Sequence, residues 1–309
     1  MKRLLMVFMT VGMVVGVVPR PAQAEAPAVT LKSLLRELID YDNLARWPEP
    51  AFTCRQASSY DRASKTPDDP KGWFANGDQN QFIRMEKVGD HTEKVMMDED
   101  GPGAVVRFWI TSGDTKKGKI RIYLDGSESP VVTVPSYDFT NNDAIPAGKP
   151  LLTSHPGASP KGRGGNTLFL PIPYAKHCKV TWEEGEKPNT FSRYYQLNYR
   201  TYPAGTSVET YSPAVLEAAK EIREQVNQTL ANPPAPTGND VLVAVLAPAD
   251  RRIEPGNEST VFLPAEAAVR QLEIQTDTTD AQSLRSLVLQ AEFDGEETIW
   301  CPVSDFFGS

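Results

Sequence analysis

The side chains best suited to chemistry are three acidic residues near the end of the chain. Asp294, Glu296 and Glu297 surround the glycine of an Asp-Gly pair, and an apolar run, 299–303, follows them. Hydrolysis of a glycoside needs one carboxylic acid that protonates the leaving oxygen and one carboxylate that attacks or stabilises the oxocarbenium-like transition state. The acidic turn offers one half of such a pair. The alternative interpretation of Glu296 is an ordinary carboxylate of a hairpin turn.

Hydrolase chemistry based on histidine has less support. His91, His155 and His177 fall in separate segments with no partner at a useful spacing. The sequence has neither a zinc-protease helix motif nor a G-x-S-x-G elbow, and isolated histidines are more often structural. Carboxylate chemistry is therefore the better hypothesis.

Cofactor and metal motifs are also absent from the sequence. The segment GDTKKGK, 113–119, superficially resembles a phosphate loop, but Ile120 stands where that loop needs Ser or Thr. The acidic triplet 98–100 lacks the ligand spacing of a calcium-binding EF-hand. We expect no cofactor and no metal, and we interpret residues 98–103 as a tight charged turn.

The acidic turn has an earlier counterpart. Segments 123–139 and 291–309 both place an Asp-Gly pair before an acidic residue, an apolar run, a proline and an Asp-Phe pair. Their wide separation indicates a duplicated domain rather than a solenoid. The first copy continues to about Tyr202, whereas only 295–309 follow the second Asp-Gly. We therefore expect an incomplete second domain whose exposed strand edges make this chain, by itself, inactive and poorly soluble.

Short β-branched and aromatic segments between Gly, Pro and Asn turns indicate an all-β fold, a pair of β-sandwiches. We expect the segment 157–165 to be a flexible surface loop. The predicted strands are 104–110, 119–124, 130–134, 167–171, 177–182 and 194–202 in the first sandwich, and 241–246, 259–263, 269–274 and 284–293 in the second.

Two helices and a linker divide the chain. Thr30 caps an amphipathic segment, 30–40, and Ser212-Pro213 opens a second helix that runs to Leu230 before a proline-rich linker. The expected organisation is a leader at 1–24, a helical lead-in at 25–50, a first sandwich at 51–211, a helix and linker at 212–236, and a second sandwich at 237–309.

The loop 57–84 has the residue types that sugar recognition needs. Planar carboxylate and guanidinium groups bind hydroxyls, and an aromatic ring stacks on an apolar sugar face. The alternative is a solvated loop with its tryptophan in the core. The candidate residues are Asp61, Arg62, Trp73, Asn76 and Asp78.

The first residues are typical of an export signal. Lys2 and Arg3 precede an uncharged apolar run, and a small-x-small site ends at Ala24. The alternative, an uncleaved anchor, needs about 20 apolar residues, more than this run provides. We predict export to the periplasm or beyond, with cleavage near Ala24.

The net charge and the cysteine content exclude several classes of binding partner and of cysteine site. The net charge of −8 becomes more negative when the basic leader is removed, which argues against nucleic acid and membrane surfaces as partners. Cys54, Cys178 and Cys301 form no disulfide framework or zinc spacing. One pair could form, but we interpret these cysteines as buried thiols.

Seven motifs along the chain resemble glycoside hydrolase family 172, formerly DUF2961. They are SSYDR (58–62), FANGD (74–78), DEDGPGAVVRFWIT (98–111), IYLDG (122–126), LPIPYAKHCKVTW (170–182), YYQLNYRTY (194–202) and DGEETIWCPVSDFFG (294–308).

The resemblance implies a double jelly roll that forms homotrimers or hexamers and cleaves α-D-fructofuranosides or D-arabinofuranosides with retention. It places the acid/base on Glu296, leaves Glu297 as the alternative, and puts the second catalytic glutamate beyond Ser309. It also implies that the SSYDR and FANGD loops, including Ser59, lie near a sugar pocket where subunits meet. The competing hypothesis is a non-catalytic carbohydrate-binding or structural jelly roll.

Overall fold

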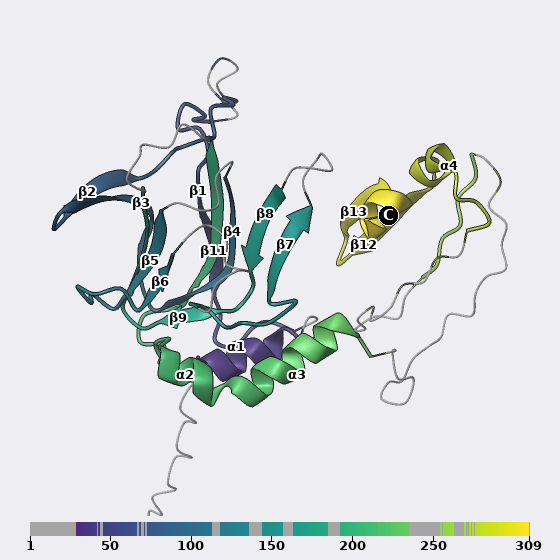
Figure 1. Ribbon diagram of the computed structural model, residues 1–309. Coiled ribbons are helices and arrows are strands. Elements are labelled where there is room, and N and C mark those ends of the chain that lie inside the picture. Colours follow the sequence, from purple (N-terminus) through teal and green to yellow (C-terminus); the bar gives the residue numbers. More distant parts are fainter. Residues whose placement is uncertain are drawn as a thin grey trace, which may run out of the picture. The chain divides into compact units, whose positions relative to one another are not determined.

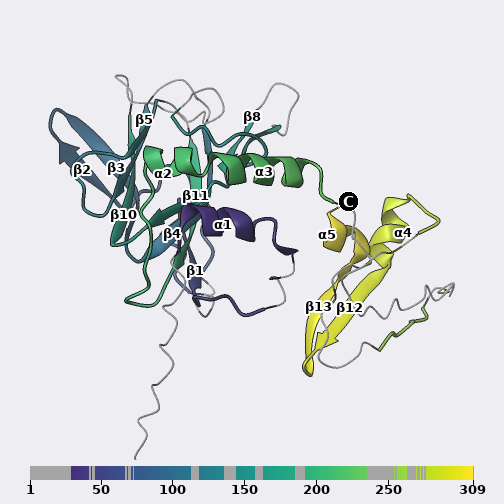
Figure 2. The same cartoon turned by 90° about the horizontal axis from the view of Figure 1, so that it is seen from below.

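The computed structural model describes the chain from Val29, and Figures 1 and 2 show it from two directions. The predicted leader, the predicted strand 241–246 and most of the predicted loop 157–165 lie outside the described residues, as do parts of the expected strands 259–263 and 269–274. Residues 259–262 are described and form no strand, so the expectation of a strand there is wrong. The positions not described are 1–28, 42, 44–45, 67, 69–70, 72, 113–117, 136–143, 157–162, 185–191, 235–253, 255, 263–268, 270–271, 273, 275 and 309.

The contacts divide the chain into two compact units, 1–234 and 235–309, and each is described by itself. The first unit is a sandwich of two antiparallel sheets, which confirms the predicted all-β fold. One sheet has the order β1 (Thr53–Ser58), β11 (Arg193–Thr201), β4 (Gly103–Ser112), β8 (Arg163–Leu168) and β7 (Leu152–Pro156), with β9 (Ile172–Tyr174) paired to β4. The other has the order β2 (Arg84–Val88), β3 (His91–Asp100), β10 (His177–Glu183), β5 (Lys119–Leu124) and β6 (Val132–Val134).

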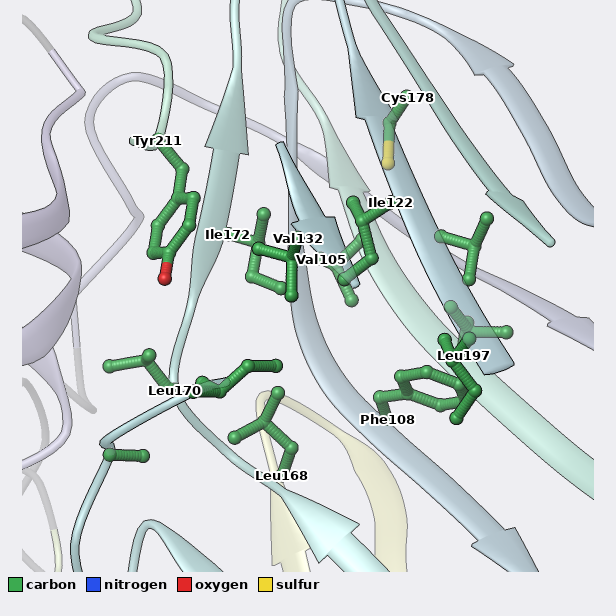
Figure 3. Packing of buried hydrophobic residues seen from close by; sticks show 14 of the residues in the cluster. Val105, Phe108, Ile122, Val132, Leu168, Leu170, Ile172, Cys178, Leu197 and Tyr211 are labelled. Carbon is green, nitrogen blue, oxygen red and sulfur yellow. The ribbon is translucent and has the colours of Figure 1, made fainter. Parts of the chain in front are cut away.

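Side chains alternate in direction along the strands, and those that point inward fill the space between the two sheets. In β10, Cys178, Val180 and Trp182 point inward and are at most 1% exposed. Side chains of β4, β5, β8 and β11 join them in the core, and Figure 3 shows Val105 of β4 and Ile122 of β5, which come from the two sheets. Apolar residues at every second position therefore form one continuous core.

Helices cover one end of the sandwich. Thr30 caps α1 (Leu31–Glu37) by accepting a hydrogen bond from Ser33 N at 3.0 Å, and Leu31 and Leu35 are fully buried. The predicted second helix is interrupted at Ala219, where the backbone leaves helical geometry between α2 (Pro213–Ala218) and α3 (Lys220–Ala231).

The described part of the second unit is a β-hairpin between two short helices. Asp280 caps α4 (Ala281–Ser286), and β12 (Val288–Phe293) pairs with β13 (Glu296–Pro302) before α5 (Val303–Phe307). The expectation of a strand throughout 284–293 is thus wrong at its start, because the Asp280 cap draws those residues into a helix.

Two other expectations need correction. The acidic triplet 98–100 belongs to β3 and pairs with residues 177–179 of β10, so the charged turn begins only at Gly101. Residues 163–165, expected in a loop, belong to β8, and the strand predicted over 167–171 ends at Leu168, with β9 starting separately at Ile172.

The three cysteines are free, and only Cys178 is buried. Cys54 is exposed on β1, an edge strand, and Cys301 is half-buried. The interpretation of all three as buried thiols is therefore wrong for Cys54. Within the described ranges, no helix has the length and apolar content to cross a membrane.

Candidate functional site

The second-unit hairpin fixes the backbone position of Glu296. Asp294 and Gly295 both have positive φ, 53° and 84°, as expected for the two central residues of a type I′ hairpin turn. Phe293 pairs with Glu296 directly across this two-residue turn. Glu296 is therefore the first residue of a strand, exposed at the tip of the hairpin.

Glu296 and Glu297 lie on opposite faces of this hairpin. Glu296 is opposite Phe293, whereas Glu297 is opposite Glu292, and successive strand residues alternate in direction. Both glutamates are exposed, and neither has a hydrogen-bond or ion-pair partner within the described residues. A sugar held against one face of the hairpin would meet only one of them.

The first-unit counterpart of this turn is held by side-chain bonds. Asp125 and Gly126 also have positive φ, 55° and 79°. The carboxylate of Asp125 accepts hydrogen bonds from the backbone N–H of Lys176 at 2.7 Å and of His177 at 3.2 Å, and another from the hydroxyl of Thr210. Asp125 therefore fastens its turn to the start of β10, and its carboxylate is fully engaged in doing so.

The loop 59–80 is organised by two of the predicted sugar-binding carboxylates. Asp61 accepts hydrogen bonds from Ala63 N at 2.9 Å and from Gly77 N at 2.7 Å, while Asp78 accepts one from Asp61 N at 2.9 Å. A Cβ atom on Gly77 would lie 2.7 Å from Asp61 Oδ2, so the contact requires glycine. These bonds bring the SSYDR and FANGD motifs side by side.

Ser59 anchors the loop to β11. It is 4% exposed, its N–H donates to the carbonyl of Tyr195 at 3.1 Å, and its Oγ accepts from Tyr195 N at 3.2 Å. Burial raises the pKa of Tyr195, and the nearby Arg62 guanidinium opposes that rise. Ser59 therefore positions the loop, and its hydroxyl is not free for a ligand.

The remaining loop candidates are accessible. Arg62 stacks over the ring of Tyr60 with 4.3 Å between its guanidinium carbon and the ring centroid. Trp73 is 50% exposed and lies 5.9 Å from the ring of Phe74, so the alternative that placed Trp73 in the core is wrong. Asn76 is exposed. The loop thus presents a guanidinium, an amide and several rings, braced by two carboxylates.

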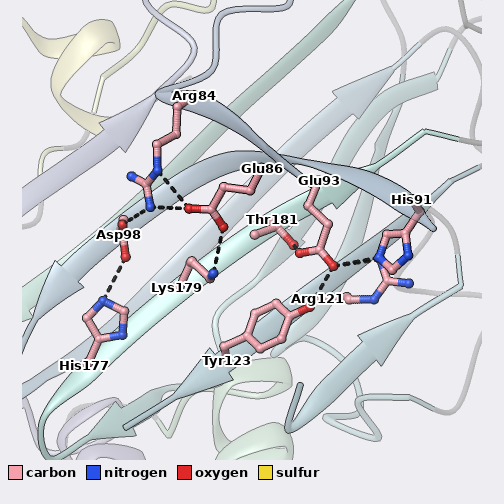
Figure 4. Close-up of polar contacts among 10 residues, drawn as sticks. All are labelled: Arg84, Glu86, His91, Glu93, Asp98, Arg121, Tyr123, His177, Lys179 and Thr181. Carbon is pink, nitrogen blue, oxygen red and sulfur yellow. Dashed lines mark hydrogen bonds and ion pairs between the residues drawn. The ribbon is translucent and has the colours of Figure 1, made fainter. Parts of the chain in front are cut away.

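A charged cluster that no sequence pattern predicted lies on the outer face of the β2–β3–β10–β5 sheet, drawn in Figure 4. Glu93 is fully buried there and accepts hydrogen bonds from Tyr123 at 2.7 Å and Thr181 at 2.6 Å. His91 Nε2 lies 3.0 Å away, and the guanidinium of Arg121 lies 3.5 Å away. These partners converge on Glu93 from three strands.

Hydrogen bonding keeps this carboxylate charged. Burial favours neutral Glu93, but hydrogen bonds from Thr181, Tyr123 and His91 outweigh it and lower the pKa of Glu93. The hydrogen bond to Glu93 in turn raises the pKa of His91. Glu93 is therefore a buried link between neighbouring strands. Sequence patterns could not reveal it, because Tyr123 and Thr181 lie 30 and 88 positions from Glu93.

The rest of the described residues offer no second candidate site. No group of three or more His, Cys, Asp or Glu side chains in those residues could hold a metal ion. A cavity of about 210 Å³ beside α2 is lined mainly by apolar residues such as Val132, Tyr211 and Leu216, and shares no residue with the loop or the hairpin. The candidate chemistry therefore rests on the loop 59–80 and on the β12–β13 hairpin.

Comparison with known proteins assigns both units to one group. The model described as GH172 first beta-sandwich domain matches residues 50–219, and the model described as GH172 domain-like matches residues 245–309. A search of curated proteins finds no match.

Proposed function

This chain belongs to glycoside hydrolase family 172, and from that premise we propose that it cleaves α-D-fructofuranosides or D-arabinofuranosides with retention of configuration. Glu296 acts as the acid/base of a two-carboxylate mechanism. The observation that carries the proposal is the type I′ turn, which places Glu296 at the exposed start of a strand inside the second matched region. Retention needs a second carboxylate about 5–5.5 Å away, on the far side of the scissile bond.

The first unit contributes recognition. Asp61 and Asp78 brace the loop, and Arg62, Trp73 and Asn76 bind the sugar through hydrogen bonds to hydroxyls and through stacking of the indole on an apolar face. A furanose ring carries both hydroxyl groups and an apolar face.

The exposed aromatic side chains of the loop support a site completed by a neighbouring subunit. Tyr60, Trp73 and Phe74 are each at least half exposed, which is costly in water and favourable against a partner. We propose a homotrimer, or a hexamer of paired trimers, in which the loop of one copy lies at a subunit boundary. Light scattering of the protein purified from its natural compartment tests this assembly.

Export is part of the proposal. Residues 1–24 act as a leader that is removed near Ala24, and the acidic mature chain works outside the cytoplasm on carbohydrate alone. Sequencing of the mature amino terminus tests this directly: a first residue near Glu25 supports it, and an intact Met1 in an exported protein contradicts it.

Turnover of defined substrates tests the activity. The complete gene product is incubated with aryl α-D-fructofuranoside and aryl α-D-arabinofuranoside, and the configuration of the released sugar is followed by NMR. Retained configuration on either substrate supports the proposal, whereas inversion or an absence of turnover contradicts it.

A non-catalytic carbohydrate-binding protein is the second candidate. It is favoured by the loop itself, in which the carboxylates are engaged by backbone and the accessible groups suit recognition rather than proton transfer. Sugar binding without turnover in the same assay would support this candidate.

A further inference from the structure

The outer face of the β1–β11–β4–β8 sheet carries a row of amide and aromatic side chains around one arginine. In β11, Tyr195, Leu197 and Tyr199 point into the core, so the residues between them face outward. The register brings outward residues of three strands together. This group, called the amide face below, consists of Gln56, Arg107, Trp109, Tyr194, Gln196 and Asn198.

Hydrogen bonds preorganise the amide face. Arg107 Nη1 donates to Gln196 Oε1 and to Asn198 Oδ1, both at 3.0 Å, and Asn198 Nδ2 donates to Gln56 Oε1 at 3.1 Å. Since the carbonyl oxygens of Gln196 and Asn198 point toward Arg107, the Gln196 amide N–H groups are directed elsewhere. Within the described residues, the other guanidinium nitrogens of Arg107 have no partner either. The face therefore presents fixed hydrogen-bond donors.

An indole ring adjoins these donors. Trp109 is half-buried beside β8, and Gly165, with φ +113°, leaves room for it: a Cβ atom there would lie 3.1 Å from Trp109 Nε1 and 2.9 Å from the carbonyl of Ile110. Tyr194 lies on the same face, opposite Thr111. A ring against a sheet, next to amides, matches the alternation of apolar and hydroxyl surfaces on a sugar chain.

The outer faces of the two sheets of the first unit differ in charge. The other sheet carries closed ion pairs on its outer face, including Glu86 with Lys179 at 2.8 Å and Asp98 with Arg84 (Figure 4). The outward residues that the structure describes on β1, β11, β4 and β8 include no carboxylate. In an acidic protein, a face that lacks acids and has free donors suits a ligand rich in hydroxyl oxygens.

The amide face is continuous with the proposed sugar loop. Ser58, opposite Gln196, is the last residue of β1, and Ser59 then starts the loop through its bonds to Tyr195. A ligand that lies along the face would reach the loop without crossing an element. Only an extended chain of sugar units could span both regions.

From these observations we propose that the amide face is a glycan-chain binding surface, which holds neutral sugar units next to the loop. The proposal takes its ligand class from the proposed function. It predicts that the protein prefers an oligosaccharide over a single glycoside.

The test measures the binding of sugars separately from their hydrolysis. Calorimetry on the Glu296→Gln protein compares a D-arabinofuranose hexasaccharide with methyl α-D-arabinofuranoside, and turnover of the aryl glycosides is measured separately on the unaltered protein. Failure of the proposed activity appears in the turnover assay alone. Failure of the present proposal appears in the calorimetry.

Trp109→Ala should weaken hexasaccharide binding about tenfold, since one buried aromatic contact commonly carries that much affinity, and should leave binding of the methyl glycoside unchanged. Asn198→Ala should act in the same direction with less risk to folding. Met85→Ala, an exposed apolar side chain on the other sheet, is the matched control.

Three results would overturn the proposal. The first is an absence of hexasaccharide binding by the parent protein, and the second is binding that both amide-face variants leave unchanged. The third is a loss of oligomeric mass in those variants without an effect on sugar, which would assign the face to a second copy of the chain.

Discussion

The two Asp-Gly turns have the same backbone and different surroundings. Asp125 and Asp294 have φ values of 55° and 53°, and the glycines that follow have 79° and 84°. The carboxylate of Asp125 accepts three hydrogen bonds, whereas Asp294 has no such partner among the described residues. Local sequence therefore determines the turn, and distant residues determine what its side chains do.

The strands after the two turns differ as well. In the second unit β13 begins at Glu296, immediately after the glycine, whereas in the first unit residues 127–131 separate the turn from β6. Glu128, the counterpart of Glu296 in the earlier copy, is an exposed loop residue. A two-residue loop therefore fixes its glutamate at a strand end, and a longer loop does not.

Exchange of the acid for an amide should have very different effects in the two copies. Glu296→Gln should lower kcat by about 10²–10⁴-fold, because a general acid typically supplies that factor, and Glu128→Gln should leave kcat unchanged. Steady-state kinetics on an aryl furanoside measures both. Thermal melting confirms that each variant is folded.

The Glu297→Gln variant tests which face of the hairpin carries the acid/base. An equal loss of kcat from this variant alone would move the acid/base to Glu297 and to the face shared with Glu292.

Removal of the aspartates should affect stability in only one copy. Asp125→Ala should lower the free energy of unfolding of the first unit by about 2–3 kcal/mol, since it leaves two backbone N–H groups and a hydroxyl without their charged acceptor. Asp294→Ala should change stability by less than about 0.5 kcal/mol. Urea denaturation measures both, and equal effects would contradict the contrast.

The glycines should instead behave alike. Gly126→Ala and Gly295→Ala should each cost about 1 kcal/mol, because an L-residue is strained at positive φ. A Cβ would meet nothing within 4 Å at either position, so strain is the only expected cost. Hydrogen exchange of the amides in β5 and in β13 reports the two turns separately, and a clear inequality would show that the turns are not equivalent.

The weakest expected effect is on pH dependence. The raised pKa of His91 means that its bond to Glu93 stabilises the first unit fully below its unfolded pKa, about 6.5, and that this stabilisation is lost as pH rises through the folded pKa. The loss should be below about 1 kcal/mol at this partly exposed site.

Urea denaturation at pH 6 and pH 8 measures this loss, and His91→Gln should reduce the difference. The second unit contains no histidine and should show no such loss over this range. A first unit that is equally stable at both pH values would contradict the assignment.

Local patterns predicted the parts of the fold that depend on neighbouring residues. The Thr30 cap located α1, and the apolar alternation of 119–124 gave the bounds of β5 without error. The Asp-Gly turn likewise located the β12–β13 hairpin. In each case the deciding contacts are a few positions apart in the sequence.

Non-local pairing explains what was missed. Asp98, Glu99 and Asp100 resemble a turn in sequence but are held in β3 by partners 177–179, far along the chain. Within the candidate site, the sequence selected Asp61 and Asp78 by type, but their role as braces depends on bonds between segments 61–63 and 77–78. The buried Glu93 has partners on three strands, so no pattern in the neighbouring sequence indicates its role.

The first described residues of the first unit contact residues near its end. Val29 donates its N–H to Ser207 at 2.9 Å and accepts from Glu209 N at 2.8 Å, and α1 packs beside α3, whose residues lie beyond the matched region 50–219 (Figure 2). During synthesis, Leu31 and Leu35 can therefore reach their final packing only after about the first 230 residues have left the ribosome. Such late closure delays folding of the first unit until the helix α3 has been synthesised.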